Sequence, residues 1–250
     1  MSIKIEICLN GVDSAIAAEK GGADRVELCD NLMEGGTTPS QGMIDAVRAA
    51  TNIGIMAMVR PRGGDFLYSD WEFDVMCRDT KLMHQHEISG VVFGLLNPNG
   101  TIDKERTAKL IELARPFPVT FHRAFDMTRE PFEALDTLLE LGVDRLLTSG
   151  QELTAWQGLP LISELQKRAG EAMIIMPAVQ VTAANVREIV QTAGLHEIHI
   201  GSNVERQIPS GMVYQNPRVA MGDDTELPEY AMPYTAADLV NEIVQAVAGL

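Results

Sequence analysis

The chain has 250 residues with 20 basic and 35 acidic side chains, a formal net charge of −15. This balance argues against nucleic acid as a partner and against an anionic membrane surface, because both need a positive face on the protein. The chain begins without a signal peptide pattern and holds no apolar run of membrane-spanning length, so we expect a cytosolic protein.

Short apolar runs alternate with amphipathic segments along the chain. The predicted strands, rich in Ile, Val, Leu and Met, are Lys4–Leu9, Arg25–Cys29, Ile53–Val59, Gly90–Gly94, Pro118–His122, Arg145–Thr148, Met173–Ala178 and Glu197–Gly201. The predicted helices are Val12–Lys20, Gln41–Ala50, Asp70–His86, Lys104–Ala114, Arg129–Leu141, Ala155–Ala169, Ala183–Thr192 and Thr235–Ala248. Eight strand–helix pairs in strict alternation predict an α/β fold, a (β/α)8 TIM barrel that forms one domain over residues 1–250.

Two further features punctuate this pattern. The stretch 22–26, Gly-Ala-Asp-Arg-Val, is echoed 120 residues later by 142–146, Gly-Val-Asp-Arg-Leu, with each glycine placed to end a helix. Duplication of a half-barrel and recurring turn chemistry both explain the echo. Residues 203–233 show no period and are rich in Pro, Gly and Asp, so we expect a long irregular segment at the barrel mouth.

The strand ends carry an unusually ionic set of residues. Glu6 and Cys8 lie two apart on the first strand, as do Glu27 and Cys29 on the second, so each pair shares one face. Because barrel active sites form at the carboxyl ends of the strands, we expect these side chains to meet.

Arginines follow the third and fifth strands. Arg60 and Arg62 flank a proline and precede Asp65, and arginine forks suit carboxylate or phosphate groups. The fifth strand ends in His122-Arg123-Ala124-Phe125-Asp126, and the sixth ends in Thr148-Ser149.

The carboxylates have two interpretations. Buried Glu6 and Glu27 need partners, so one interpretation is a structural ion network in which Arg60, Arg62 or Arg123 neutralises them. The other, which we favour, is a functional site, because paired ionisable groups cluster at such sites. His122 is then the first candidate for a general acid or base. His199 is either a satisfied strand histidine or part of the site.

The cysteines also have two interpretations. Cys8 and Cys29, with Met56 and Met58 on the next strand, are soft ligands of the kind that select Cu(I). Local metal-binding spacings such as Cys-x-x-Cys are absent from the sequence, and free cysteines often serve as small buried hydrophobic residues.

Several motifs in order resemble the CutC family, the bacterial copper homeostasis proteins with a TIM-barrel fold. They are residues 22–29 (GADRVELC), 34–40 (EGGTTPS), 60–66 (RPRGGDF), 120–126 (TFHRAFD) and 147–150 (LTSG). The resemblance implies a role in copper homeostasis, Cu(I) as a metal ligand held by Cys8 and Cys29, and a homodimer. One departure is residues 176–181, MPAVQV, where the family has a glycine-rich segment, which argues against a backbone phosphate site there.

Two functions follow from the residues and the resemblance. The first is a cytosolic CutC-like protein that binds Cu(I). The alternative is an enzyme that performs acid–base chemistry on a small anionic or polyhydroxylated metabolite at the mouth. Its catalytic candidates are His122, Glu6, Glu27 and Asp126. Its substrate-binding candidates are Arg60, Arg62, Asp65, Arg123, Thr148 and Ser149.

Overall fold

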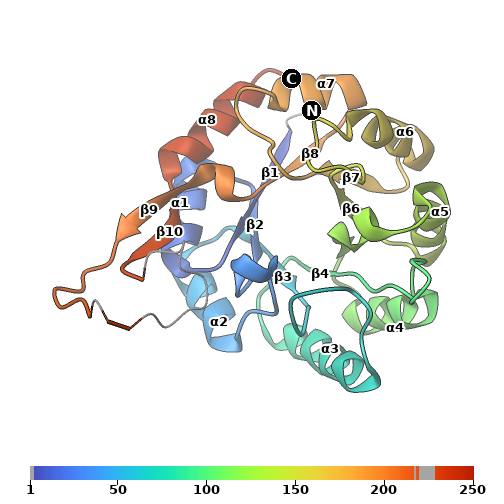
Figure 1. Cartoon of the computed structure of the whole chain (residues 1–250). Coiled ribbons are helices and arrows are strands. Elements are labelled where there is room, and N and C mark those ends of the chain that lie inside the picture. Colours follow the sequence, from blue (N-terminus) through green and yellow to red (C-terminus); the bar gives the residue numbers. More distant parts are fainter. Residues whose placement is uncertain (1–2, 217, 220–228) are drawn as a thin grey trace.

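A computed structural model gives the structure of the protein for residues 3–216, 218–219 and 229–250. Eight parallel strands form a ring in the order β7-β6-β5-β4-β3-β2-β1-β8 (Figure 1). Neighbours in this order are joined by backbone hydrogen bonds, and β7 and β8 are its two ends. The strands are β1 (Lys4–Leu9), β2 (Arg25–Leu28), β3 (Gly54–Met58), β4 (Gly90–Phe93), β5 (Val119–Phe121), β6 (Arg145–Thr148), β7 (Ile174–Pro177) and β8 (Glu197–Ile200). The predicted TIM barrel is confirmed.

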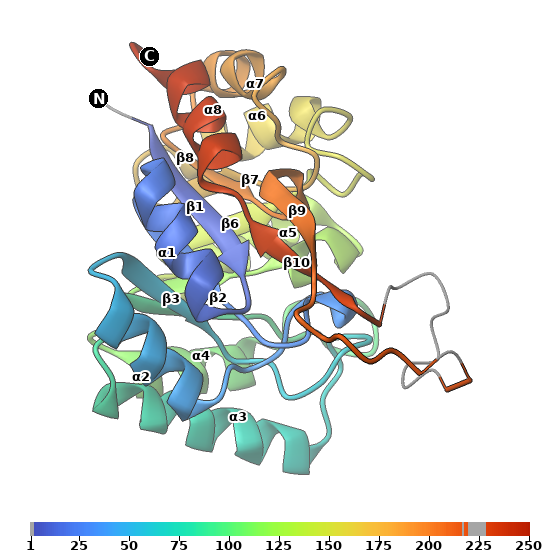
Figure 2. The ribbon, with the colours of Figure 1, turned by 90° about the vertical axis from the view of Figure 1, so that its left-hand side faces the viewer.

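Eight helices surround the ring (Figures 1 and 2). They are α1 (Val12–Gly21), α2 (Gln41–Ala50), α3 (Asp70–Leu82), α4 (Lys104–Ala114), α5 (Pro131–Leu141), α6 (Leu159–Ala169), α7 (Val186–Ala193) and α8 (Ala237–Val247). Two depart most from expectation: α3 ends four residues early in a 3-10 turn, η2 (Met83–Gln85), and α6 starts four residues late, with a proline in its first turn. Among the described helices, each is too short or too polar to cross a membrane.

Local chemistry sets the helix ends. Ser69 and Glu72 form a reciprocal capping box that starts α3. Gly22 and Gly142, the glycines of the repeated motif, end α1 and α5 in the left-handed region, with φ of 95° and 70°. Only glycine adopts that conformation without a steric penalty, so both predicted helix ends are confirmed.

The main hydrophobic core lies between the sheet and the helices. Alternate strand residues such as Ile5, Ile7 and Leu28 are fully buried there. The opposite parity points into the barrel and carries Glu6, Arg25 and other charged groups. The ionic residues of the sequence therefore fill the barrel interior.

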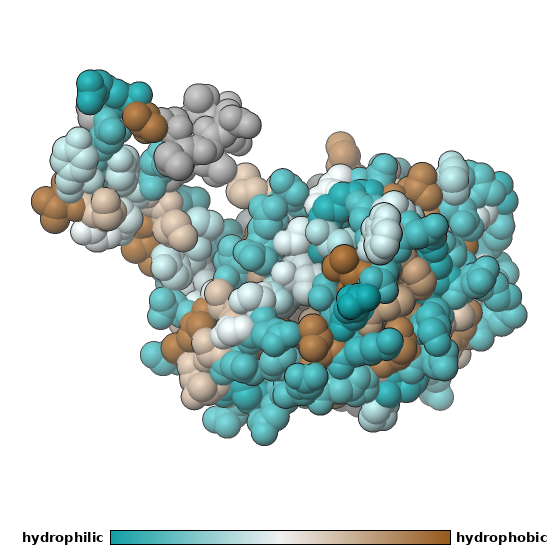
Figure 3. Space-filling view, turned by 90° about the horizontal axis from the view of Figure 1, so that it is seen from below, coloured by the Kyte–Doolittle hydropathy of each residue, from teal (hydrophilic) through white to brown (hydrophobic). Residues whose placement is uncertain are grey.

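The segment after β8 differs from expectation. Residues 203–233 were expected to be irregular, but β9 (Glu205–Pro209) and β10 (Ala231–Thr235) form an antiparallel pair. Residues 217 and 220–228 lie outside the described part. The pair extends away from the barrel and carries exposed hydrophobic side chains (Figures 2 and 3). Pairing over more than 20 residues leaves no local period, which explains why the sequence missed it.

Candidate functional site

A cavity of about 590 Å³ opens where the parallel strands end. Five of the predicted site residues line it: Cys8, Glu27, Arg60, His122 and Arg123. His199 lines it too, and Glu205 and Pro233 of the β9–β10 pair contribute to one wall. This is the end of a barrel at which active sites form.

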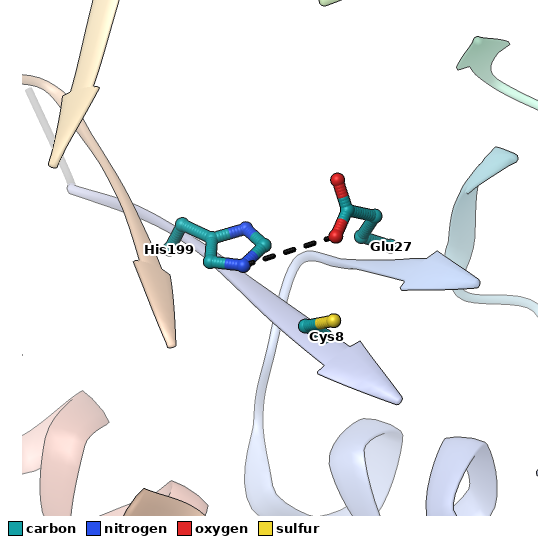
Figure 4. Close-up of side chains that lie close together, drawn as sticks. All are labelled: Cys8, Glu27 and His199. Atoms are coloured by element: carbon teal, nitrogen blue, oxygen red, sulfur yellow. Dashed lines mark ion pairs between the residues drawn. The ribbon is translucent and has the colours of Figure 1, made fainter. Parts of the chain in front are cut away.

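Cys8, Glu27 and His199 meet at the floor of the cavity from β1, β2 and β8 (Figure 4). The parallel register pairs Cys8 with Glu27, whereas His199 pairs with Glu6. One thiol, one carboxylate and one imidazole ligand atom all lie within 4.8 Å of one another. Such a set of donor groups is able to hold a metal ion.

The second predicted thiol lies directly behind the first. Cys29 is 1% exposed, donates a hydrogen bond to Glu27 Oε2 at 3.7 Å, and packs with Cys8, Met56 and Met58 in one cluster. The structure thus brings both predicted metal ligands together, although Cys29 lies behind the cavity wall. Four sulfur-containing residues from the first three strands and their ends, Cys8, Cys29, Met56 and Met58, thus belong to one cluster.

The thiols are protonated at neutral pH. The neighbouring Cys29 thiol and burial raise the pKa of Cys8 well above its ordinary value. For Cys29 the neighbouring Cys8 thiol lowers the pKa, but burial and the Glu27 carboxylate raise it to about 11. A metal ion that binds both sulfurs must therefore displace protons.

Beneath the cavity, charges of alternating sign run through the barrel interior. Arg145 donates a hydrogen bond to Glu197 at 2.9 Å, Glu197 also binds Arg25, and the Arg25 Nε donates to Glu6 at 2.5 Å. The other oxygen of Glu6 accepts from His199 Nδ1 at 2.8 Å. Burial raises the pKa of Glu6, but Arg25 and His199 outweigh it and lower the value to about 2.

These contacts correct one expectation. The predicted neutralising partners Arg60, Arg62 and Arg123 are wrong for Glu6, whose partners are Arg25 and His199. Glu6 precedes Cys8 by two residues on β1 and so lies one layer deeper, among the charges that hold the barrel together.

His199 links this network to the cavity. Burial lowers its pKa, but Glu27, Cys8 and Glu6 outweigh burial and hold the pKa well above its ordinary value, so the ring is an imidazolium. Its Nε2 lies 3.9 Å from Glu27 Oε2. Burial raises the pKa of Glu27 against the effect of His199, and within the described residues Glu27 Oε1 has no hydrogen-bond partner. His199 is thus both a satisfied strand histidine and a cavity residue.

Arg60 follows β3, the strand next to β2, and is buried in the cavity wall with 4% exposure. Its Nη1 donates to the carbonyls of Glu34 and Gly36, both at 2.8 Å, and its Nη2 donates to the carbonyl of Gly64 at 2.9 Å. Gly36 has a φ of 86°, and a Cβ there would lie 2.9 Å from Cys29 Sγ. The glycine therefore lets one loop reach both the arginine and the thiol.

His122 ends β5 beside Arg60. Its Nδ1 accepts a hydrogen bond from the Ala124 N–H at 3.1 Å, so the ring proton of the neutral form sits on Nε2. Burial and then the Arg60 charge lower the pKa of His122 to about 3. The predicted general acid or base is thus a neutral hydrogen-bond donor at physiological pH.

Other predicted binding residues lie outside the cavity wall. Arg62 donates five hydrogen bonds, from Nε to Glu72, from Nη1 to the carbonyls of Gly63 and Asp65, and from Nη2 to Asp65 Oδ1 and the Leu67 carbonyl. All five guanidinium protons are used. Arg62 and Asp65 therefore fold the loop after β3.

Asp126 organises the loops after β5 and β6. It accepts hydrogen bonds from the Thr148 hydroxyl, from the Ser149 N–H at 3.0 Å and from the Gln151 N–H at 3.2 Å, and it pairs with Arg123 at 2.8 Å. Arg123 reaches the cavity from this cluster, whereas the carboxylate itself points into the loops.

The loop after β7 keeps a glycine-like backbone without glycine. Val179 and Gln180 have φ values of 75° and 56°, in the left-handed region that disfavours a β-branched residue such as valine. The substituted segment 176–181 thus holds a strained loop conformation.

Sequence reasoning missed Arg25, Arg145 and Glu197. The repeated Gly-x-Asp-Arg motif was the available signal, because Arg25 and Arg145 both bind Glu197. The aspartates of the two motifs also act alike: Asp24 accepts from the Ile5 N–H at 2.9 Å and Asp144 from the Val119 N–H at 2.7 Å. The echo marks two equivalent structural positions in the barrel.

Comparison with known proteins agrees with the motifs. The model of the CutC family matches residues 3–204. A human protein named copper homeostasis protein cutC homolog is 46% identical over 231 residues, which cover 92% of this chain and 84% of the human one. A CutC family protein from Mesorhizobium japonicum is 46% identical over 242 residues, covering 97% and 93% of the two chains.

A solved structure shows the same fold. The crystal structure of a CutC protein from Streptococcus agalactiae superposes with a TM-score of 0.75 at 33% identity, covering 79% of this chain and 98% of that one. The family match, the identity of full-length relatives and the shared barrel lead to one conclusion: the chain belongs to the CutC family.

Proposed function

We propose that this protein is a cytosolic copper homeostasis protein that binds Cu(I) as its cargo, with Cys8 and Cys29 as ligands. The observation that carries the proposal is the packing of the two thiols in one cluster, with Cys8 beside His199. Thiolates and thioethers are the ligands that Cu(I) prefers, and Met58 lies in the same cluster. The names of the relatives support the same role.

The surroundings suit uptake of a cation. The two thiols lose protons when the metal binds, so the Cu(I)–dithiolate centre carries excess negative charge, which the His199 imidazolium beside it balances. Entry is from the cavity, which Cys8 lines.

Anaerobic titration with Cu(I) against a chromogenic chelator tests this proposal. We expect one tight site in the native chain and its loss in Cys8→Ser and in Cys29→Ser. Cys77→Ser is the matched control, because Cys77 lies on α3 outside the sulfur cluster. Equal Cu(I) affinity in all four proteins would show that these thiols are not ligands.

An enzyme acting by acid–base chemistry on a small anionic or polyhydroxylated metabolite is the second candidate. Within the described residues, Arg60 Nε, His122 Nε2 and Glu27 Oε1 are buried without a hydrogen-bond partner, and all three residues line the cavity. Arg60 would hold the anion, neutral His122 would donate a hydrogen bond, and Glu27, with its raised pKa, would transfer the proton. Turnover in a metabolite screen that disappears in Glu27→Gln supports this candidate, and unchanged turnover contradicts it.

We also infer that the protein is a homodimer that uses the β9–β10 arm, residues 205–216 and 229–235. Val213 and Tyr214 on the arm are 99% and 71% exposed, which favours burial against a partner. Light scattering after size exclusion should give a dimer for the native chain and a monomer for Val213→Asp. The control is Leu153→Asp, at a position that is 81% exposed on another loop.

A further inference from the structure

We propose that the cavity wall formed by Arg60, His122 and Phe66 is a binding site for a small organic carboxylate that carries a hydroxyl group. This inference rests on the second proposed function only for the reaction that would follow binding. Binding itself does not require turnover.

Arg60 is the first reason. Backbone carbonyls accept from three of its five N–H donors and the Tyr68 hydroxyl lies beside the guanidinium, but within the described residues Nε–H has no hydrogen-bond partner. Among the residues that the structure describes, no carboxylate lies within ion-pairing distance of this guanidinium. A buried cation that only carbonyl dipoles compensate is costly, and an anionic ligand removes that cost.

His122 is the second reason. Because its Nδ1 accepts from Ala124, its Nε2 carries a proton, and within the described part of the chain nothing accepts it. The ring is 4% exposed and lines the same cavity. A buried donor without an acceptor costs free energy unless a ligand or water supplies the acceptor.

Phe66 joins these two donors. The Arg60 guanidinium lies 5.1 Å from the centroid of the Phe66 ring, and the His122 ring centroid lies 4.9 Å from the same ring. Both residues therefore contact one aromatic side chain, and all three residues line the same cavity. The unpartnered Nε–H of the fixed guanidinium and the Nε2–H of the imidazole are two donors, which suits the two oxygens of a carboxylate.

The donor set favours carboxylate over phosphate. Barrels that bind phosphate commonly use backbone N–H groups of the loops after the seventh and eighth strands. Among described residues, the loop after β8 contributes Gly201 and Ser202 to the cavity lining, whereas the loop after β7 contributes nothing. Leu32, Met58 and Leu147 line the cavity as well, so the ligand needs a short carbon skeleton.

Glu27 defines the second group of the ligand. Its Oε1 is buried and, as far as the described residues go, unpartnered. A hydroxyl group both donates and accepts, so it satisfies Glu27 whether that carboxyl is charged or protonated. A hydroxycarboxylic acid therefore matches every unpartnered polar atom named on this cavity.

Calorimetric titration of the copper-free, reduced protein tests the proposal. The probes are glycolate, lactate and glycerate, the neutral amides glycolamide and lactamide, and inorganic phosphate. We expect saturable binding of at least one hydroxy acid, with its amide and phosphate weaker by about tenfold or more. Absence of hydroxy-acid binding, or equal binding of the amide or phosphate, would overturn the proposal.

Two variants locate the site. In His122→Asn the shorter side chain keeps an acceptor for Ala124 but loses the Nε2–H donor, and in Arg60→Lys the fork is lost. Each variant should bind the hydroxy acid about tenfold more weakly than the native chain does. The control is Arg129→Gln, whose guanidinium pairs with Glu133 at the surface. If Arg60→Lys fails to fold, His122→Asn decides alone, and unchanged affinity there contradicts the assignment. Binding without turnover supports this inference while it counts against the enzyme.

Discussion

Arg60 and Arg62 stand two residues apart, yet the protein uses all five N–H donors of Arg62 and only three of those of Arg60. Arg62 is satisfied within its own loop and by Glu72. Arg60 is buried at the cavity and keeps donors free. The two arginines are equivalent in the sequence pattern and distinct in the folded chain.

Arg60 also holds its surroundings together, so Arg60→Met should destabilise the fold. The change removes three hydrogen bonds from a charged donor and leaves buried carbonyls without partners, at a cost of about 3 kcal/mol. Urea denaturation measures the difference in unfolding free energy. A loss below about 1 kcal/mol would mean that the loops do not depend on the guanidinium.

Glu6→Gln should cost about 3 kcal/mol of unfolding free energy, because it breaks a buried ion network whose arginine remains. The pKa of Glu6 is lowered to about 2 from an ordinary value of 4.5. Its contribution is therefore fully present above pH 4.5 and is lost as the pH falls toward 2. Stability curves of native and Glu6→Gln proteins should converge across that window, and parallel curves would contradict the assignment.

The pKa values of the two cavity histidines should be shifted in opposite directions from the ordinary value. NMR of the ring nitrogens at pH 7 should find His122 neutral, with its proton on Nε2, and His199 doubly protonated. Since the folded pKa of His122 is about 3, its contribution to stability is present above pH 6.5 and is lost as the pH falls toward 3. The folded pKa of His199 is raised, so its contribution to stability is present below pH 6.5 and is lost at higher pH. A neutral His199 at pH 7 would refute this picture.

Asp126→Asn should destabilise the chain by about 2 kcal/mol. Both carboxylate oxygens of Asp126 accept hydrogen bonds from N–H or O–H groups, and an amide has only one oxygen to accept them. The amide nitrogen would face one of these donors. Thermal unfolding measures the effect, and Asp136→Asn, at a surface pair with Arg168, is the control. Equal melting temperatures for the two variants would argue against an organising role for Asp126.

The alternation of apolar runs and amphipathic segments was enough to predict the barrel, because burial on both faces of a parallel strand and the glycine helix ends are local properties of the chain. Strand parity likewise placed Cys8 and Glu27 together at the mouth, since side chains two apart share a face and parallel strands end at one edge.

Pairing across the barrel could be decided only by the tertiary structure. The local sequence does not predict that Glu6 pairs with Arg25 and His199, because these contacts depend on the register between strands. It does not predict that Arg60 binds carbonyls instead of carboxylates, because those contacts depend on loop geometry. The type of residue at the mouth followed from the sequence. Which of those residues are satisfied and which remain open to a ligand followed from the fold, since hydrogen-bond partners are set by distance in space.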